Sequence, residues 1–223
     1  YILGRYRVSG IIVSGTIIRG NPDPASDLDI YVIHQEDFRQ RIQKFFGHIP
    51  AEIFVNPPHK VEAYFVEEGS KRRPITAHML ATGFVILDID PVIQDLIQKA
   101  KRLMAQPPAA PKDLTTHRYF PALLFEDAVD IAQNDPATAQ MILSQAVTEM
   151  LNFSFIQAGE FIPRQKSLLK ELEKIDDVTA DLPRNFFEGT SFDLRLDIAG
   201  KIADRTIKER DFFEWKVPPE KLP

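Results

Sequence analysis

Short apolar and alternating runs recur through the first hundred residues of the chain. Such runs, bounded by Gly, Pro or Asn, predict strands at 11–14, 28–33, 51–56 and 84–88. Stretches with helical spacing lie between and after them, and predict helices at 37–46, 60–68, 74–81 and 91–104. Strands and helices mixed in this order predict a sheet domain of the α+β kind over residues 1–105.

The pattern changes after residue 105. Residues 105–114, AQPPAAPKDL, are rich in Pro and Ala and lack apolar periodicity, which is typical of a linker. Beyond them no strand pattern appears, and helices are expected at 115–133, 136–158, 164–175 and 192–212. We therefore predict an α+β chain, with a mixed-sheet domain at 1–105 followed by an all-α helical bundle at 115–223.

Composition excludes several classes of protein. The chain has no cysteine, which rules out disulfides and thiolate zinc sites and is compatible with the cytoplasm, where we expect the protein. No apolar run is long enough for a membrane span, so no membrane association is expected. A net charge of −5 argues against nucleic acid as a partner, since nucleic-acid binding needs a basic surface.

Candidate chemistry concentrates in the segment VSGTIIRGNPDPASDLDIYVI, residues 13–33. Asp27 and Asp29 are two residues apart on a predicted strand, so both side chains project from the same face. Neighbouring carboxylates repel unless a cation lies between them, and Mg²⁺ prefers such oxygens. Glu52, which opens a strand with an otherwise apolar face, is the candidate third metal ligand; the alternative is a solvent-exposed glutamate at a strand start.

The residues before these aspartates suit a phosphate-binding turn. Gly15 has no side chain and lets the backbone approach a triphosphate closely. The Thr16 hydroxyl and nearby amides can donate to phosphate oxygens. Arg19 would contact a phosphate or brace the turn, and Ser26 completes the set of expected nucleotide-binding residues.

The pattern Gly15-Thr16, Arg19-Gly20 and Ser26-Asp27-Leu28-Asp29 resembles the nucleotidyltransferase superfamily that includes DNA polymerase beta. In that family a Gly-Ser turn precedes Asp-x-Asp, and a later strand supplies a third carboxylate. The resemblance covers roughly residues 8–90, and Thr16 replaces the usual serine while keeping its hydroxyl. Size, linker and helical second half look like the small kanamycin-type nucleotidyltransferases, in which the helical domain helps bind the acceptor and supplies a carboxylate base.

The resemblance implies Mg²⁺-dependent transfer of a nucleoside monophosphate from an NTP, ATP being expected, to a hydroxyl of a small-molecule acceptor. Glu126 and Asp130 share a predicted helix face, and either is a candidate general base. An acidic second domain favours a cationic acceptor. Transfer to a protein or RNA, as in toxin–antitoxin systems, and a catalytically silent nucleotide-binding module remain alternatives. A homodimer is compatible with the sequence.

Overall fold

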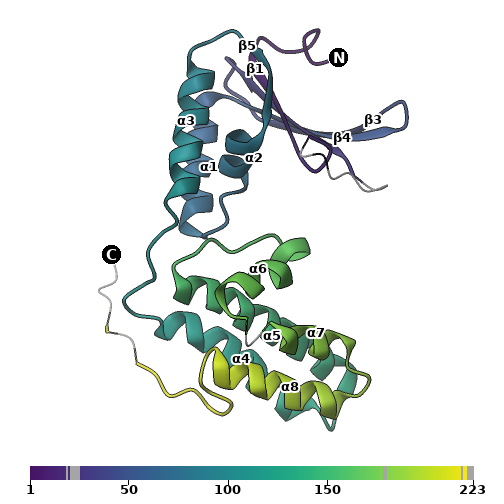
Figure 1. Ribbon diagram of the computed structural model, residues 1–223, viewed down its shortest axis with the longest axis vertical. Helices are drawn as coiled ribbons and strands as arrows, with labels where there is room; N and C mark the ends of the chain where they lie inside the picture. Colours follow the sequence, from purple (N-terminus) through teal and green to yellow (C-terminus); the bar gives the residue numbers. More distant parts are fainter. Residues whose placement is uncertain (19, 21–25, 178–179, 217, 220–223) are drawn as a thin grey trace. The chain divides into compact units, whose positions relative to one another are not determined.

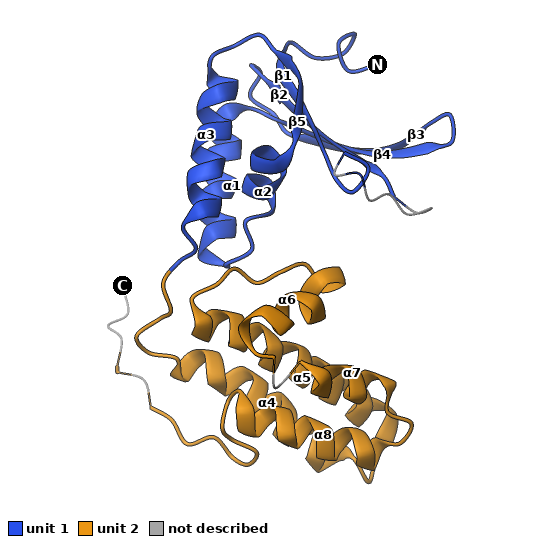
Figure 2. Cartoon of the chain, viewed as in Figure 1, with its two compact units in different colours: residues 1–108 blue, residues 109–223 orange. Residues whose placement is uncertain are grey.

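The chain forms two compact units, Tyr1–Pro108 and Ala109–Pro223 (Figure 2). The computed structural model describes residues 1–18, 20, 26–177, 180–216 and 218–219. Each unit has its own hydrophobic core, so each is described by itself. The predicted α+β class, with a mixed sheet followed by a helical part, is confirmed.

The first unit is built on a five-stranded sheet with the order β3-β4-β2-β1-β5. Its strands are β1 (Val8–Ser14), β2 (Leu28–His34), β3 (Gln40–Phe46), β4 (Ile49–Asn56) and β5 (Phe84–Asp88). Strands β2 and β4 pair in parallel, and the other neighbours are antiparallel. The parallel pair lies at the centre of the sheet, where a rigid backbone fixes the side chains that it carries.

Three helices cover one face of this sheet: α1 (Pro58–Ser70), α2 (Ile75–Thr82) and α3 (Val92–Ala105) (Figure 1). Ile12, Tyr31 and Ile33 point to that face and are buried against the helices, as period-two alternation requires. A half-buried polar link joins α1 to α2, because the Glu68 carboxylate accepts hydrogen bonds from the Thr76 amide (2.6 Å) and hydroxyl (2.8 Å).

The predicted helix at 37–46 is wrong. Residues 40–46 form strand β3, which pairs antiparallel with β4 as a hairpin. Gly47, interpreted as a helix stop, instead turns the hairpin with a φ of +63°. A left-handed glycine suits both roles, so its presence could not decide between them. Ile42 is the only residue of the strand that is partly buried. The segment therefore has no continuous buried apolar face of the kind that a packed helix needs.

The second unit is all-helical among the described residues, as predicted. It contains α4 (Thr115–Ile131), α5 (Pro136–Ala158), a single 3₁₀ turn (Gln165–Ser167) leading into α6 (Leu168–Ile175), α7 (Asp181–Glu188) and α8 (Phe192–Arg205). The Asp135 side chain caps α5 by accepting from the Thr138 amide at 3.0 Å, and Gly159 ends the helix at a φ of +72°. Helix α5 carries much of the core through buried residues such as Leu143 and Met150.

Two details of the second unit differ from the prediction. The helix expected at 192–212 ends at Arg205, and Lys208 with a φ of +58° redirects the chain. Helix α7 was not predicted, and it contains Pro183. Proline is tolerated there because the N–H groups of the first helical turn have no hydrogen-bond acceptor within the helix, so none is lost. Among the described residues, no helix has both the length and the apolar character needed to cross a membrane.

Candidate functional site

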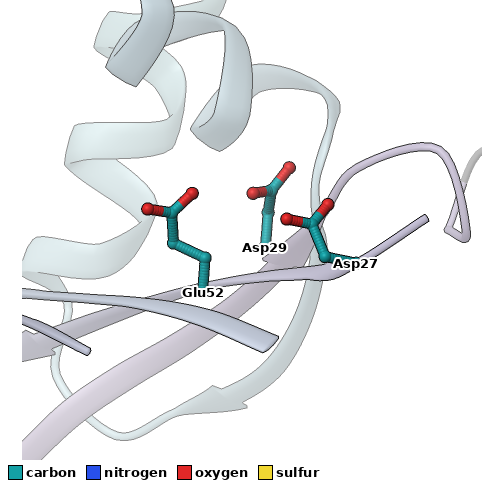
Figure 3. Close-up of side chains that lie close together, drawn as sticks. All are labelled: Asp27, Asp29 and Glu52. Atoms are coloured by element: carbon teal, nitrogen blue, oxygen red, sulfur yellow. The ribbon is translucent and has the colours of Figure 1, made fainter. Parts of the chain in front are cut away.

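The carboxylates of Asp27, Asp29 and Glu52 come together at the centre of the sheet, on the parallel strands β2 and β4 and the residue before β2. Each offers an oxygen, and these oxygens all lie within 4.8 Å of one another. Asp29 is the direct partner of Glu52 in the parallel register of β2 and β4, and Asp27 immediately precedes β2. Figure 3 shows the three side chains rising from the same side of the sheet toward a common space.

The donor set of this cluster fits a hard divalent cation. Three carboxylates at such separations repel one another, and a cation between them removes the repulsion. Mg²⁺ binds carboxylate oxygens, usually together with the phosphates of a substrate. Asp27 is exposed, whereas Asp29 and Glu52 are half-buried, so the cluster is open on one side to a ligand from solvent.

Strand β3 adds two donors that the sequence prediction missed. The Arg41 guanidinium forms an ion pair with Glu52 Oε1, and Gln43 Nε2 donates to the same oxygen at 3.3 Å. Among the described residues, both of these donors reach Oε1 of Glu52, and neither reaches its Oε2. The apolar residues of QRIQKFF are spaced three and four apart, as in a helix, so the segment itself gave no signal that these side chains would lie beside Glu52.

The turn after β1 brings the backbone against the carboxylates. Gly15 has a φ of +99°, and a Cβ added there would lie 3.0 Å from Asp29 Oδ2. Any other residue would be strained and would press on Asp29, so the position requires glycine. The turn is held closed because the hydroxyls of Thr16 and Ser26 hydrogen-bond at 2.8 Å.

The other predicted site residues are Arg19, Glu126 and Asp130. Arg19 lies outside the described residues. Glu126 and Asp130 are both on α4 of the second unit, where Glu126 is half-buried and Asp130 exposed. Their assignment as candidate bases stays a prediction.

No protein-family model matches the sequence, and no curated protein matches it either. The structure is similar to the crystal structure of a nucleotidyltransferase-like protein from Exiguobacterium sibiricum. That similarity has a TM-score of 0.51 at 12% sequence identity, and it covers 92% of this chain and 70% of the other. At this identity the likeness shows a shared fold, and function depends on the residues of the site.

Proposed function

We propose that the protein is a nucleotidyltransferase that moves a nucleoside monophosphate from Mg²⁺-bound NTP, with ATP as the expected donor, to a hydroxyl of a small-molecule acceptor. Pyrophosphate is the leaving group. The single observation that carries the proposal is the cluster of Asp27, Asp29 and Glu52 beside the Gly15 turn, on a fold shared with a nucleotidyltransferase-like protein.

Each part of the site has a role in this proposal. Asp27, Asp29 and Glu52 would hold Mg²⁺, which when bound neutralises charge on the phosphates and orients an in-line displacement. The Gly15–Thr16 turn, with Arg19 and Ser26, would bind the triphosphate. These last four residues would fix the donor, because such transfer depends mainly on positioning.

The acceptor side of the proposal rests on the second unit. A carboxylate of Glu126 or Asp130 would take the proton of the attacking hydroxyl, provided that it comes within hydrogen-bond reach of that hydroxyl. Glu126 is half-buried and Asp130 is exposed, so fewer water molecules surround the Glu126 carboxylate. This difference favours Glu126 as the base.

One observation supports a second candidate, a nucleotide-binding module without transfer activity. The Arg41 guanidinium already neutralises part of the Glu52 charge, and a stable ion pair there would weaken a second metal position. Both candidates bind nucleotide, but only the transferase releases pyrophosphate.

The test combines binding with turnover. Thermal unfolding is measured with each NTP, with and without Mg²⁺, for the wild type, Asp29→Asn and Glu36→Gln. Glu36 is an exposed carboxylate of the same unit outside the cluster, so its variant is the matched control. We expect a Mg²⁺-dependent rise in Tm in the wild type and the control that is lost in Asp29→Asn.

Pyrophosphate release against a panel of hydroxylated amines, other hydroxylated small molecules, RNA and protein then measures transfer. Release with a small molecule supports the transferase, and binding without release to any acceptor class supports the silent module. Retention of the Mg²⁺-dependent shift in Asp29→Asn would show that the metal assignment is wrong.

A further inference from the structure

A cavity of about 420 Å³ lies within the second unit, between α4 and the chain that follows α8. Helix α4 contributes Tyr119, Leu123 and Glu126. The other wall is the segment 212–215, Phe-Phe-Glu-Trp. The cavity is within the size range of small-ligand sites, which begins at roughly 300 Å³.

Specific contacts hold the second wall against α4. Arg118 Nε donates to the Ile207 carbonyl at 2.7 Å, and Phe213 is only 8% exposed. The Tyr119 and Trp215 rings stack with centroids 4.6 Å apart. These contacts make the cavity a formed feature of the unit, although the segment has no regular secondary structure.

The lining combines aromatic rings with uncompensated negative charge. Four of the seven lining side chains are aromatic, and two are glutamates, Glu126 and Glu214. Among the described residues, no cationic side chain or hydrogen-bond donor pairs with either carboxylate. Aromatic faces and carboxylates both attract cations, and together they recognise substituted ammonium groups.

The aromatic cluster already accommodates one cation. The Arg118 guanidinium lies over the Phe213 ring, 5.0 Å from its centroid, while its Nε is committed to the Ile207 carbonyl. Phe212 and Trp215 remain 72% and 37% exposed, so aromatic surface is accessible to a ligand beside the two carboxylates.

We propose that this cavity is a binding site for an organic cation, a substituted ammonium compound, held by the aromatic rings and by Glu126 and Glu214. An anionic ligand would meet two like charges there, and a neutral apolar ligand would gain no attraction from either carboxylate. The proposal is argued from residues of the second unit alone, and it shares Glu126 with the proposed function, in which that residue is the favoured base.

Choline is a suitable probe, with dimethylbutanol as its uncharged carbon isostere. Trp215 is the only tryptophan of the chain, so its emission reports directly on the cavity wall. In titrations of the full chain without nucleotide or Mg²⁺, we expect a saturable change of emission with choline, and matching heat by calorimetry. The isostere should bind at least about tenfold more weakly.

Variants of the lining residues test whether these side chains bind choline. Glu126→Gln and Glu214→Gln should each weaken choline binding about three- to tenfold, since each removes one charge from the wall. Phe212→Leu should weaken it about threefold, and folding should tolerate this change because the ring is largely exposed. Asp127→Asn is the matched control: Asp127 is exposed on the same helix and does not line the cavity.

Equal affinity for choline and its isostere would overturn the proposal, because the cavity would then be merely apolar. An equal loss in Asp127→Asn and in the glutamine variants would also overturn it, by attributing binding to overall charge. The absence of saturable binding would do the same. Failure of this proposal is distinguishable from failure of the proposed function, because the titrations contain neither nucleotide nor metal and measure binding without transfer.

Discussion

Replacing Arg41 by glutamine should tighten the binding of a divalent cation to the carboxylate cluster. The guanidinium forms an ion pair with Glu52 Oε1, so it lies beside the space that the ion would fill. The guanidinium attracts the carboxylate, but it repels the ion. The sign of the effect depends on which of these interactions is larger.

The structure allows a rough comparison. For an ion roughly 5 Å from the guanidinium, the repulsion is about 1.7 kcal/mol at the dielectric constant of water. The Arg41 side chain is 65% exposed but that of Glu52 only 13%, so the dielectric constant of water gives a lower bound, which salt at 0.1 M reduces to about 1 kcal/mol. An exposed ion pair contributes about 0.2–1 kcal/mol, only part of which orients Glu52. Gln43 keeps its hydrogen bond to Oε1 and retains some of that orientation.

Repulsion therefore exceeds the loss of orientation, and we expect Arg41→Gln to bind the ion about threefold more tightly. Mn²⁺ is a suitable probe, because the electron paramagnetic resonance signal of the free ion gives the bound fraction directly. Lys44→Gln is the control: it removes one positive charge from the same strand, but Lys44 alternates to the opposite face and lies over the Tyr1 ring. Weaker Mn²⁺ binding in Arg41→Gln would refute the reasoning and identify Arg41 as a positioning residue. Equal changes in the two variants would also refute it, because only the net charge would then matter.

Three further predictions concern stability. Gly15→Ala should lower the free energy of unfolding by at least about 1 kcal/mol in urea titrations, because alanine is strained at this φ and presses on Asp29. Gly69→Ala, within α1 and with open space around it, should raise the free energy by about 0.5–1 kcal/mol; equal effects of the two changes would contradict the role of the turn. Burial raises the pKa of the Glu68 carboxyl, so wild-type stability should fall as the pH rises from the usual glutamate range through this pKa. Glu68→Gln should remove that fall in pH-dependent thermal unfolding, and an unchanged profile would exclude Glu68 as its source. Hydrogen bonds from the Thr138 hydroxyl and amide lower the pKa of Asp135, so its stabilising effect is present above the usual aspartate range and is lost as the pH falls through the lowered pKa. Asp135→Asn keeps a capping side chain but cannot titrate, and it should flatten this acid dependence; a steeper dependence would contradict the assignment.

The two aspartates were predictable because their geometry is local to one strand, where period-two alternation puts Asp27 and Asp29 on one face. The position of Glu52 beside them depends on the parallel pairing of β2 with β4, and its charge in an apolar strand was the signal for it. The helical half was predictable for a similar reason, since Asp135 and Gly159 mark the ends of a helix in the sequence itself.

The secondary structure of residues 40–46 was not predictable from their own pattern of apolar and polar residues. They bury little, and they form a strand because the edge of β4 offers unpaired backbone groups, which is a non-local cause. Arg41 was missed for this reason. Residues 206–212 were assigned to a longer helix for a related reason, because the turn at Lys208 depends on packing against α4.

The hairpin of β3 and β4 has a consequence for the order in which the chain folds. Its strands are joined only by the turn around Gly47, so it can close within microseconds, before β4 finds β2. Arg41 would then pair with Glu52 early, and the strand that docks beside Asp27 and Asp29 would arrive with its negative charge already balanced. Arg41→Gln should consequently slow refolding more than Lys44→Gln does in stopped-flow measurements at low salt. The Arg41–Glu52 ion pair would therefore weaken cation binding in the folded protein, but during folding it would reduce the repulsion among the three carboxylates.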